Sequence, residues 1–303
     1  MAAGFSKEKT IEKLTRYRGR IAPSPTGLLH VGHARTFWTA QERARAAGGT
    51  LILRNEDLDP ERSKAEYAAA MVEDLRWLGI RWDEGPDVGG AVGPYAQSER
   101  RGFYLDMWRR LLAGGWVYPC RCSRKDLGRI AQAPHEQAGG EVRTEGDEGP
   151  MYAGTCRLER DAAMEMAGRY AEPAGVNWRF RIPEGEAVTF EDGHFGAQRF
   201  VAGEDFGDFA VWRRDDVPGY QLAVVADDRA MGITEVVRGA DLLLSTARQI
   251  LLYRALGWAE PGWFHCDLVT DAGGERLAKR HDALAIRTLR EQGKTPEEVR
   301  GMG

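Results

Sequence analysis

Apolar runs that end in polar residues mark the expected strands of this chain. Residues 50–53 (Thr-Leu-Ile-Leu) are followed at once by the polar residues 54–57, among them Glu56, which is typical of a buried parallel strand. Open α/β sheets bind ligands at the carboxyl ends of such strands. Residues 220–228 and an expected strand at 263–269 repeat the buried pattern later in the chain. These patterns together predict an α/β fold with a parallel sheet.

Helical composition and periodicity predict helices between these strands. Residues 34–47 are rich in alanine and arginine, which favour helix. A second helix is expected from about Ser63, since Ser63 and Glu66 form a capping-box pattern ahead of an apolar face. Further helices are expected at 98–112 and 242–256.

The middle of the chain differs in composition. Residues 131–151 are polar and rich in glycine, which indicates an exposed loop or insertion of low intrinsic order. Short strand-like runs at 177–182, 187–190 and 208–213 indicate a small β-rich subdomain inserted into the surrounding fold. We therefore expect the first half of an α/β domain at residues 16–116, a smaller inserted α+β subdomain at 117–207, and the second half of the α/β domain at 208–303.

Composition sets limits on class and location. The chain has 303 residues, of which 43% are hydrophobic and 29% charged, as in an ordinary globular protein of one or two domains. No apolar run has membrane-spanning length and the first twenty residues lack a signal core, so we expect a cytoplasmic protein that does not contact membranes. Four cysteines are too few for a disulfide framework. The net charge of −4 argues against general adhesion to nucleic acid, although a local basic surface would suffice to bind RNA.

Residues 20–33 (Arg-Ile-Ala-Pro-Ser-Pro-Thr-Gly-Leu-Leu-His-Val-Gly-His) combine a turn, two histidines and the start of a helix. Free backbone N–H groups and the helix dipole favour phosphate at such a helix N-terminus. His30 and His33 can donate hydrogen bonds to phosphoryl oxygens, and Gly32 lets a nucleobase or ribose approach the backbone. For the tetrapeptide His-Val-Gly-His alone, two histidines satisfied at a helix cap would be the commoner explanation.

Together with the preceding Ala-Pro-Ser-Pro-Thr-Gly, this segment resembles the nucleotide-binding signature of class I aminoacyl-tRNA synthetases, specifically the glutamyl and glutaminyl branch. The resemblance implies a Rossmann-type catalytic domain that condenses an amino acid with ATP, releases pyrophosphate and passes the aminoacyl group to RNA. It implies that His30 and His33 are catalytic, and that ATP also contacts Pro23 and Gly32.

Two short segments carry most of the thiols. Cys120 and Cys122 precede the polar stretch, and Tyr152 and Cys156 follow it. Spacing alone leaves two interpretations open, a closed structural metal site or buried thiols beside a core tyrosine. The pattern resembles the Cys-x-Cys, Tyr-x-x-x-Cys zinc site of glutamyl-Q tRNA synthetases, a family of truncated glutamyl-tRNA synthetases, in which the two halves usually lie nearer in sequence. This resemblance implies structural Zn²⁺.

Glutamate recognition needs cations for carboxylates and an anion near the ammonium group. Arg20, Tyr220, Arg238 and Glu56 offer these chemistries, although each alone has an equally acceptable structural explanation. Together they match the positions at which the glutamyl branch holds its amino acid. The resemblance adds two residues of the same loop, Ala22 and Ser24.

A glycine turn precedes the sequence Glu-Arg-Leu-Ala-Lys-Arg at residues 275–280. Lys279 resembles the second lysine of the class I KMSKS loop, which implies a contact with ATP phosphates in the transition state. Ala278 stands where serine is usual, and Arg276 where the first lysine is usual. These departures leave slowed activation as a possibility.

The resemblance implies one function in particular. The enzyme would activate L-glutamate with ATP and Mg²⁺ without tRNA, and transfer it to queuosine in the anticodon loop of tRNA(Asp). Only 24 residues follow Lys279 in the sequence, so we expect a catalytic core without an anticodon-binding domain. We also expect a monomer. Two alternatives stay open: a truncated glutamyl-tRNA synthetase that charges a tRNA 3′ end, and a non-catalytic glutamate or nucleotide sensor.

Overall fold

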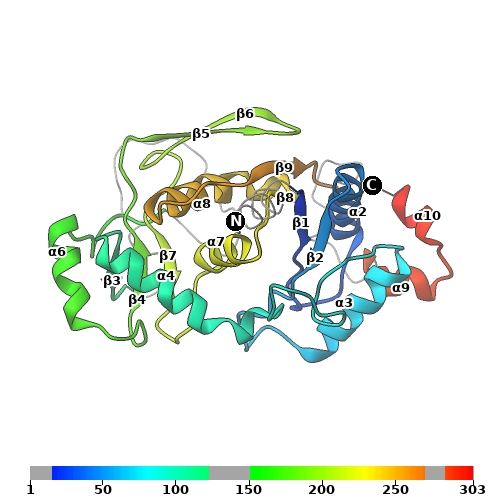
Figure 1. The fold of residues 1–303 in the computed structure, drawn as a ribbon, viewed down its shortest axis with the longest axis horizontal. Helices are drawn as coiled ribbons and strands as arrows, with labels where there is room; N and C mark the ends of the chain where they lie inside the picture. The colour runs from blue at the N-terminus through cyan, green and yellow to red at the C-terminus, as the bar shows by residue number, and fades with distance from the viewer. Residues whose placement is uncertain (1–15, 123–150, 270–283, 303) are drawn as a thin grey trace, which may run out of the picture.

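Two parallel pieces of sheet lie next to each other near the centre of the molecule (Figure 1). The computed structural model describes residues 16–122, 151–269 and 284–302. In it β1 (Arg18–Ile21) pairs in parallel with β2 (Thr50–Leu53), and β8 (Glu235–Gly239) pairs in parallel with β9 (Gly262–Cys266). The backbone N–H of Thr234 donates to the carbonyl of Arg18 at 2.9 Å, which joins the start of β8 to β1. Segments from opposite ends of the chain thus meet in one region.

Helices cover these strands largely where the sequence predicts them, with shifted ends. The helices expected at 34–47, 98–112 and 242–256 are confirmed as α2, α4 and α8. The helices of the described residues are α2 (Val31–Ala46), α3 (Ala65–Trp77), α4 (Arg101–Ala113), α6 (Arg160–Glu165), α7 (Tyr220–Ala230), α8 (Leu243–Ala255), α9 (Ile286–Glu291) and α10 (Pro296–Arg300), with single 3-10 turns η1 (Gln97–Glu99), η3 (Met166–Arg169) and η4 (Ala240–Leu242).

The capping box expected at Ser63 and Glu66 is wrong. Helix α3 begins at Ala65, with Lys64 as its N-cap residue. The backbone N–H of Ser63 donates to Asp59 at 2.9 Å, and that of Lys64 donates to the carbonyl of Pro25 at 3.0 Å. Because these contacts fix the preceding turn, the N-cap of the helix lies one residue later than the capping-box pattern indicates.

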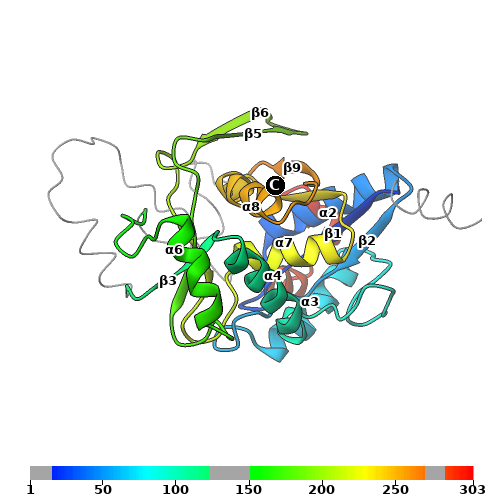
Figure 2. The same ribbon diagram turned by 60° about the vertical axis from the view of Figure 1, so that its left-hand side comes forward.

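A three-stranded antiparallel sheet forms one end of the molecule. It contains β3 (Val117–Cys120), β4 (Asn177–Phe180) and β7 (Phe209–Trp212), in the order β3-β4-β7. Helix α6 lies beside it, as both views show (Figures 1 and 2). Strand β7 follows residue 207, so this sheet extends past the expected boundary of the inserted subdomain.

The strand expected at 187–190 does not belong to that small sheet. It forms β5 (Ala187–Asp192), which makes a hairpin with β6 (Gly196–Val201) and pairs in parallel with β9 through Asp192 and Trp263. The order of the resulting sheet is β6-β5-β9-β8. The hairpin therefore extends the central sheet, a pairing that strand periodicity cannot predict because it depends on residues far away in sequence.

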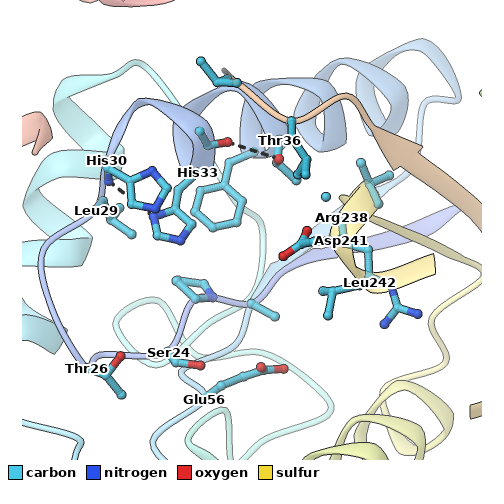
Figure 3. A pocket seen from close by; sticks show the side chains of 18 of the residues that line it. Ser24, Thr26, Leu29, His30, His33, Thr36, Glu56, Arg238, Asp241 and Leu242 are labelled. Atoms are coloured by element: carbon cyan, nitrogen blue, oxygen red, sulfur yellow. Dashed lines mark hydrogen bonds between the residues drawn. The ribbon is translucent and has the colours of Figure 1, made fainter. Parts of the chain in front are cut away.

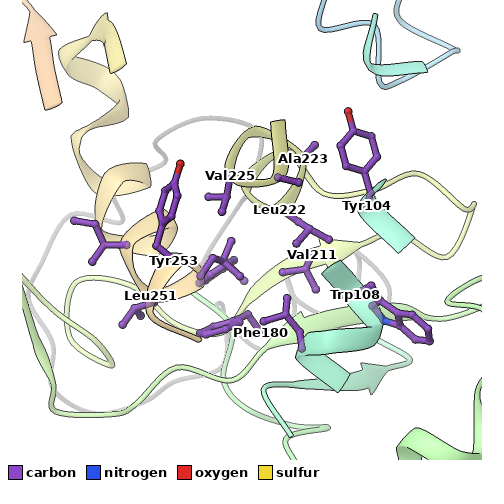
Figure 4. Close-up of a cluster of buried hydrophobic side chains, with 14 of the residues drawn as sticks. Tyr104, Trp108, Phe180, Val211, Leu222, Ala223, Val225, Leu251 and Tyr253 are labelled. Carbon is purple, nitrogen blue, oxygen red and sulfur yellow. The ribbon is translucent and has the colours of Figure 1, made fainter. Parts of the chain in front are cut away.

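The two larger apolar cores of the described residues hold most elements together. One lies between α2, α3 and the strands β1 and β2, and includes Phe37, Leu53 and Leu75. The other joins α4, α7 and α8 to the small sheet through side chains such as Trp108 and Leu222 (Figure 4). None of the helices in the described residues combines the length and apolar composition that a membrane span requires.

Candidate active site and cysteine cluster

One cavity of about 520 Å³ lies at the carboxyl ends of β1 and β8, a volume typical of small-molecule sites. All the residues that the sequence predicts for glutamate and ATP, Lys279 excepted, line it: Arg20, Ala22, Pro23, Ser24, His30, Gly32, His33, Glu56, Tyr220 and Arg238. Lys279, with Arg276 and Ala278, lies outside the described residues. Figure 3 shows the histidines, Glu56 and Arg238 on different sides of the cavity.

The two histidines lie at the start of α2. His30 is the N-cap residue and His33 is in the first turn, so the helix begins at Val31 rather than at 34. Their rings are 3.7 Å apart between centroids. The backbone N–H of His30 donates to Nδ1 of His33 at 3.3 Å. Since Nδ1 accepts this bond, the neutral His33 ring carries its proton on Nε2, where it can donate to a ligand.

The loop before the histidines is fixed at several points. The backbone N–H of Glu56 donates to the carbonyl of Pro23 at 3.1 Å, and that of Ile286 donates to Leu29 at 2.7 Å. A Cβ at Gly32 would lie 3.1 Å from the His30 ring, so glycine here also makes room for that imidazole. The segment after residue 283 is thus attached directly to the histidine loop.

Glu56 is held by a buried arginine that the sequence analysis did not assign. Arg54 is fully buried and contacts Glu56 Oε1 at 2.8 Å and Asp228 Oδ1 at 2.6 Å. Burial is the largest influence on the Glu56 carboxyl and raises its pKa above the usual value, although Arg54 acts in the opposite direction. A bound cation, such as an ammonium group, would stabilise the charged form of Glu56.

Arg20 also has a carboxylate nearby. Its Nη1 donates to the carbonyl of Val237 at 2.9 Å, and its Nε lies 3.4 Å from Asp228 Oδ1. The hydrogen bond to the Val237 carbonyl fixes the Arg20 side chain in an orientation that reaches from β1 to β8. Arg20 therefore stabilises the fold and also lines the cavity.

Arg238 has a different environment. Its side chain is 4% exposed and donates to three uncharged groups, His265 Nε2 at 3.2 Å, Gln249 Oε1 at 2.9 Å and Thr246 Oγ1 at 2.6 Å. Among the residues that the structure describes, no carboxylate forms an ion pair with it. Burial lowers the pKa of Arg238 from its usual value, yet a guanidinium stays charged in proteins. A buried cation without an anion is costly unless a ligand supplies one.

Several polar residues of the site escaped the sequence analysis. Arg54, Asp227 and Asp228 form a buried charged cluster, and Asp192 and His265 lie behind Arg238. The sequence feature that could have revealed these residues is a charged residue within an otherwise apolar segment, such as the two aspartates at the end of residues 220–228. Their partners come from distant segments, so the sequence did not indicate which charge meets which.

The cysteine cluster forms as predicted at the end of β3. The sulfur atoms of Cys120, Cys122 and Cys156 all lie within 4.8 Å of one another, and this set could bind a metal ion such as zinc. The Tyr152 hydroxyl lies 3.6 Å from Cys120 Sγ and 4.0 Å from Cys122 Sγ, and it accepts a bond from the backbone N–H of Cys156 at 2.6 Å. The four predicted ligands are therefore neighbours in space despite the separation in sequence. The expected loop at 131–151 lies outside the described residues except for Met151.

A cation accompanies the thiols. Arg179 Nε donates to Cys120 Sγ at 3.4 Å, and its guanidinium lies 4.0 Å above the ring centre of Tyr152. Arg179 thus contacts two of the four predicted ligands.

Comparison with known proteins gives close relatives. A protein named glutamyl-Q tRNA(Asp) synthetase from Nitratidesulfovibrio vulgaris is 50% identical over 287 residues, which is 94% of this chain and 84% of the relative. A protein of the same name from Symbiobacterium thermophilum is 51% identical over 283 residues, with 93% and 84% covered.

A solved structure and a family model agree with these relatives. A glutamate tRNA ligase from Elizabethkingia meningosepticum, solved in complex with its amino acid, superposes with a TM-score of 0.75 at 28% identity, covering 95% of this chain and 61% of that one. The catalytic-domain model of the class I tRNA synthetases (E and Q) matches residues 16–302. The chain therefore belongs to the class I tRNA synthetases of the glutamate and glutamine group.

Proposed function

We propose that this protein activates L-glutamate with ATP and transfers the glutamyl group to queuosine in the anticodon loop of tRNA(Asp). Two relatives named glutamyl-Q tRNA(Asp) synthetase are half identical to the chain over most of their own length, which supports this proposal. The cavity gathers the residues expected to hold both substrates.

The lack of an ion-pair partner for Arg238 within the described residues is the observation that carries the glutamate assignment. Arg54 and Arg20 have carboxylates within 3.4 Å, whereas the hydrogen bonds of Arg238 in this part of the chain go to uncharged groups. A carboxylate of glutamate would complete this site. Glu56 would then face the ammonium group, and the Tyr220 hydroxyl, at the start of α7, would add a polar contact.

The reaction needs positioning and charge stabilisation rather than a side-chain nucleophile. A glutamate carboxylate oxygen attacks the α-phosphorus of ATP, the bond to pyrophosphate breaks, and a mixed anhydride with AMP forms. His30 and His33 stabilise charge on the phosphoryl oxygens at the helix N-terminus, and Lys279 approaches the leaving phosphates. Mg²⁺ supplies further positive charge on the phosphates when bound. A hydroxyl of the queuosine cyclopentenediol then attacks the carbonyl carbon, and AMP leaves.

The cysteine cluster would hold Zn²⁺ as a structural ion. Three thiolates and the Tyr152 phenol supply four protein donors, which leaves no place for a reactive water. We expect about one equivalent of zinc per chain by elemental analysis of protein prepared without chelators. Metal-free protein would contradict an occupied site.

The acceptor is tested with two RNAs. Purified protein is incubated with labelled glutamate, ATP, and tRNA(Asp) that either carries or lacks queuosine. Label on the modified RNA alone supports the proposal. Equal label on both would show that queuosine is not the acceptor.

A truncated glutamyl-tRNA synthetase is the first alternative, favoured by the superposition on a glutamate tRNA ligase. It would charge the terminal adenosine of the tRNA, so removal of that adenosine would abolish labelling. Under our proposal the same removal leaves labelling intact.

A glutamate or nucleotide sensor is the second alternative. It would show no glutamate-dependent exchange of pyrophosphate into ATP. We expect exchange without tRNA, and we expect Lys279→Ala to lower its rate on the order of 10²-fold with little change in glutamate affinity. Lys294→Ala, a surface lysine paired with Glu298, is the matched control. An unchanged rate in Lys279→Ala would exclude that lysine from the reaction.

A further inference from the structure

Behind Arg238 lies a buried pair of residues to which the preceding mechanism gives no role. His265 in β9 is fully buried, and Asp192 at the end of β5 is 2% exposed. Nδ1 of His265 lies 2.6 Å from Asp192 Oδ2, and Nε2 lies 3.2 Å from Nε of Arg238. Hydrogen bonds thus connect Asp192 in β5, His265 in β9 and Arg238 in the wall of the cavity.

The directions of these hydrogen bonds determine the tautomer of the imidazole. The Nε of a guanidinium can only donate, so Nε2 of His265 must be unprotonated to accept from it. The ring proton then lies on Nδ1 and is donated to the Asp192 carboxylate. The neutral Nδ1–H tautomer therefore satisfies Asp192 and Arg238, and its unprotonated Nε2 can also accept from the Thr246 hydroxyl, whose oxygen lies 3.0 Å away.

Asp192 is held firmly in the charged form that this arrangement needs. Its carboxylate accepts from the backbone N–H groups of His194 at 3.0 Å, Phe195 at 2.9 Å and His265 at 3.1 Å. Burial acts to raise the pKa of Asp192, but hydrogen bonds, that from His265 first, outweigh it and hold the pKa below its usual value.

The charged groups around His265 act on its ring in opposite directions. Arg238 from β8 and Arg20 from β1 oppose a second positive charge, whereas Asp192 from β5 favours one. The groups from α8, Thr246 and Gln249, are uncharged. Burial is the largest influence and, with Arg238, lowers the pKa of His265 to about 4.

We propose that Asp192 and His265 are positioning residues that orient the Arg238 guanidinium toward the carboxylate of the bound amino acid. The imidazole accepts from Nε, while Gln249 and Thr246 accept one proton each from the terminal nitrogens. These three bonds use three of the five N–H donors and fix the plane of the group. Donors on both terminal nitrogens then remain for the ligand. This role rests on the proposed function, since it assumes that Arg238 binds glutamate.

The first test observes the ring directly in the unmodified protein. Long-range proton–nitrogen NMR correlations distinguish the two neutral tautomers and the protonated form of a histidine. We expect the Nδ1–H tautomer for His265 at pH 7 and no titration of its signals between pH 5.5 and 8. An Nε2–H tautomer or a protonated ring would overturn the proposal, because neither can accept from Arg238.

The second test separates positioning from folding. His265→Leu removes the acceptor, whereas His265→Gln keeps an acceptor oxygen at a similar distance from the backbone. In pyrophosphate exchange, we expect His265→Leu to raise KM for glutamate about 10-fold or more, as expected for loss of a hydrogen bond to a charged group. KM for ATP should change less than about 3-fold, and His265→Gln should stay within about 3-fold of wild type for both substrates.

The outcomes remain distinguishable from failure of the proposed function. Wild-type protein without any glutamate-dependent exchange would reject the function itself. Normal exchange with an unchanged glutamate KM in a folded His265→Leu protein would reject only the positioning role. Reduced stability of His265→Leu with equal changes in KM for glutamate and for ATP would also reject the positioning role, because loss of a purely structural residue has that effect.

Discussion

Two buried arginines near the cavity have opposite electrostatic environments. Arg54, directly after β2, contacts the carboxylates of Glu56 and Asp228, whereas Arg238, in β8, donates to uncharged groups alone among the residues that the structure covers. Both side chains are almost completely removed from water. The difference teaches that burial alone does not identify a ligand-binding charge. The charges of the neighbouring side chains distinguish Arg54, which stabilises the fold, from Arg238, which can bind an anionic ligand.

Removing the paired arginine should give the largest effect, and on stability. Arg54→Met removes the cation that Glu56 contacts and the nearer of the two arginines beside Asp228, so we expect the free energy of unfolding to fall by about 3–5 kcal/mol. Urea denaturation measures it. Arg109→Met is the matched control, because Arg109 is half exposed and its ion pairs should contribute at most about 1 kcal/mol. Similar losses in both variants would remove the contrast between buried and surface pairs.

Removing the unpaired arginine should mainly affect activity. Arg238→Gln keeps hydrogen-bond donors but removes the charge, so we expect kcat/KM for glutamate in pyrophosphate exchange to fall by about 10²–10³-fold. The melting temperature should stay close to that of wild type, because no internal carboxylate loses a partner. A large drop in melting temperature with normal exchange would reverse the roles assigned to the two arginines.

Substrate choice refines the comparison further. Glutamine presents a neutral amide to the cation, so we expect glutamate to be activated at least ~100-fold better than glutamine. The preference should be weakened more by Arg238→Gln than by Arg20→Gln, since Arg20 already has Asp228 nearby. Comparable exchange with both amino acids in the wild-type protein would contradict a carboxylate-binding site. A larger loss of preference in Arg20→Gln would transfer the side-chain contact to Arg20.

The sequence predicted the parts of the site that belong to continuous motifs. The histidine loop, Glu56 after its strand and Arg238 before a helix could be located because local pattern and family resemblance agree there. The pairings Arg54–Asp228 and Asp192–His265 could not, since the partners lie 174 and 73 positions apart and each looks like an ordinary charge within its own segment. The capping box predicted at Ser63 was wrong for a related reason, because contacts with Pro25 and Asp59 fix the turn that precedes the helix.

The meeting of β1 with β8 has a consequence for the synthesis of this protein. Arg20 of the first strand reaches its backbone partner Val237 only after 217 further positions have been translated. Until that stretch leaves the ribosome, the apolar side of β1 and α2 lacks part of its cover, and the cavity lacks the lining that residues 237–239 supply. Such distant pairing makes folding slow and the unfinished chain prone to aggregation. We therefore expect protection of the nascent N-terminal third by chaperones to raise the yield of folded protein.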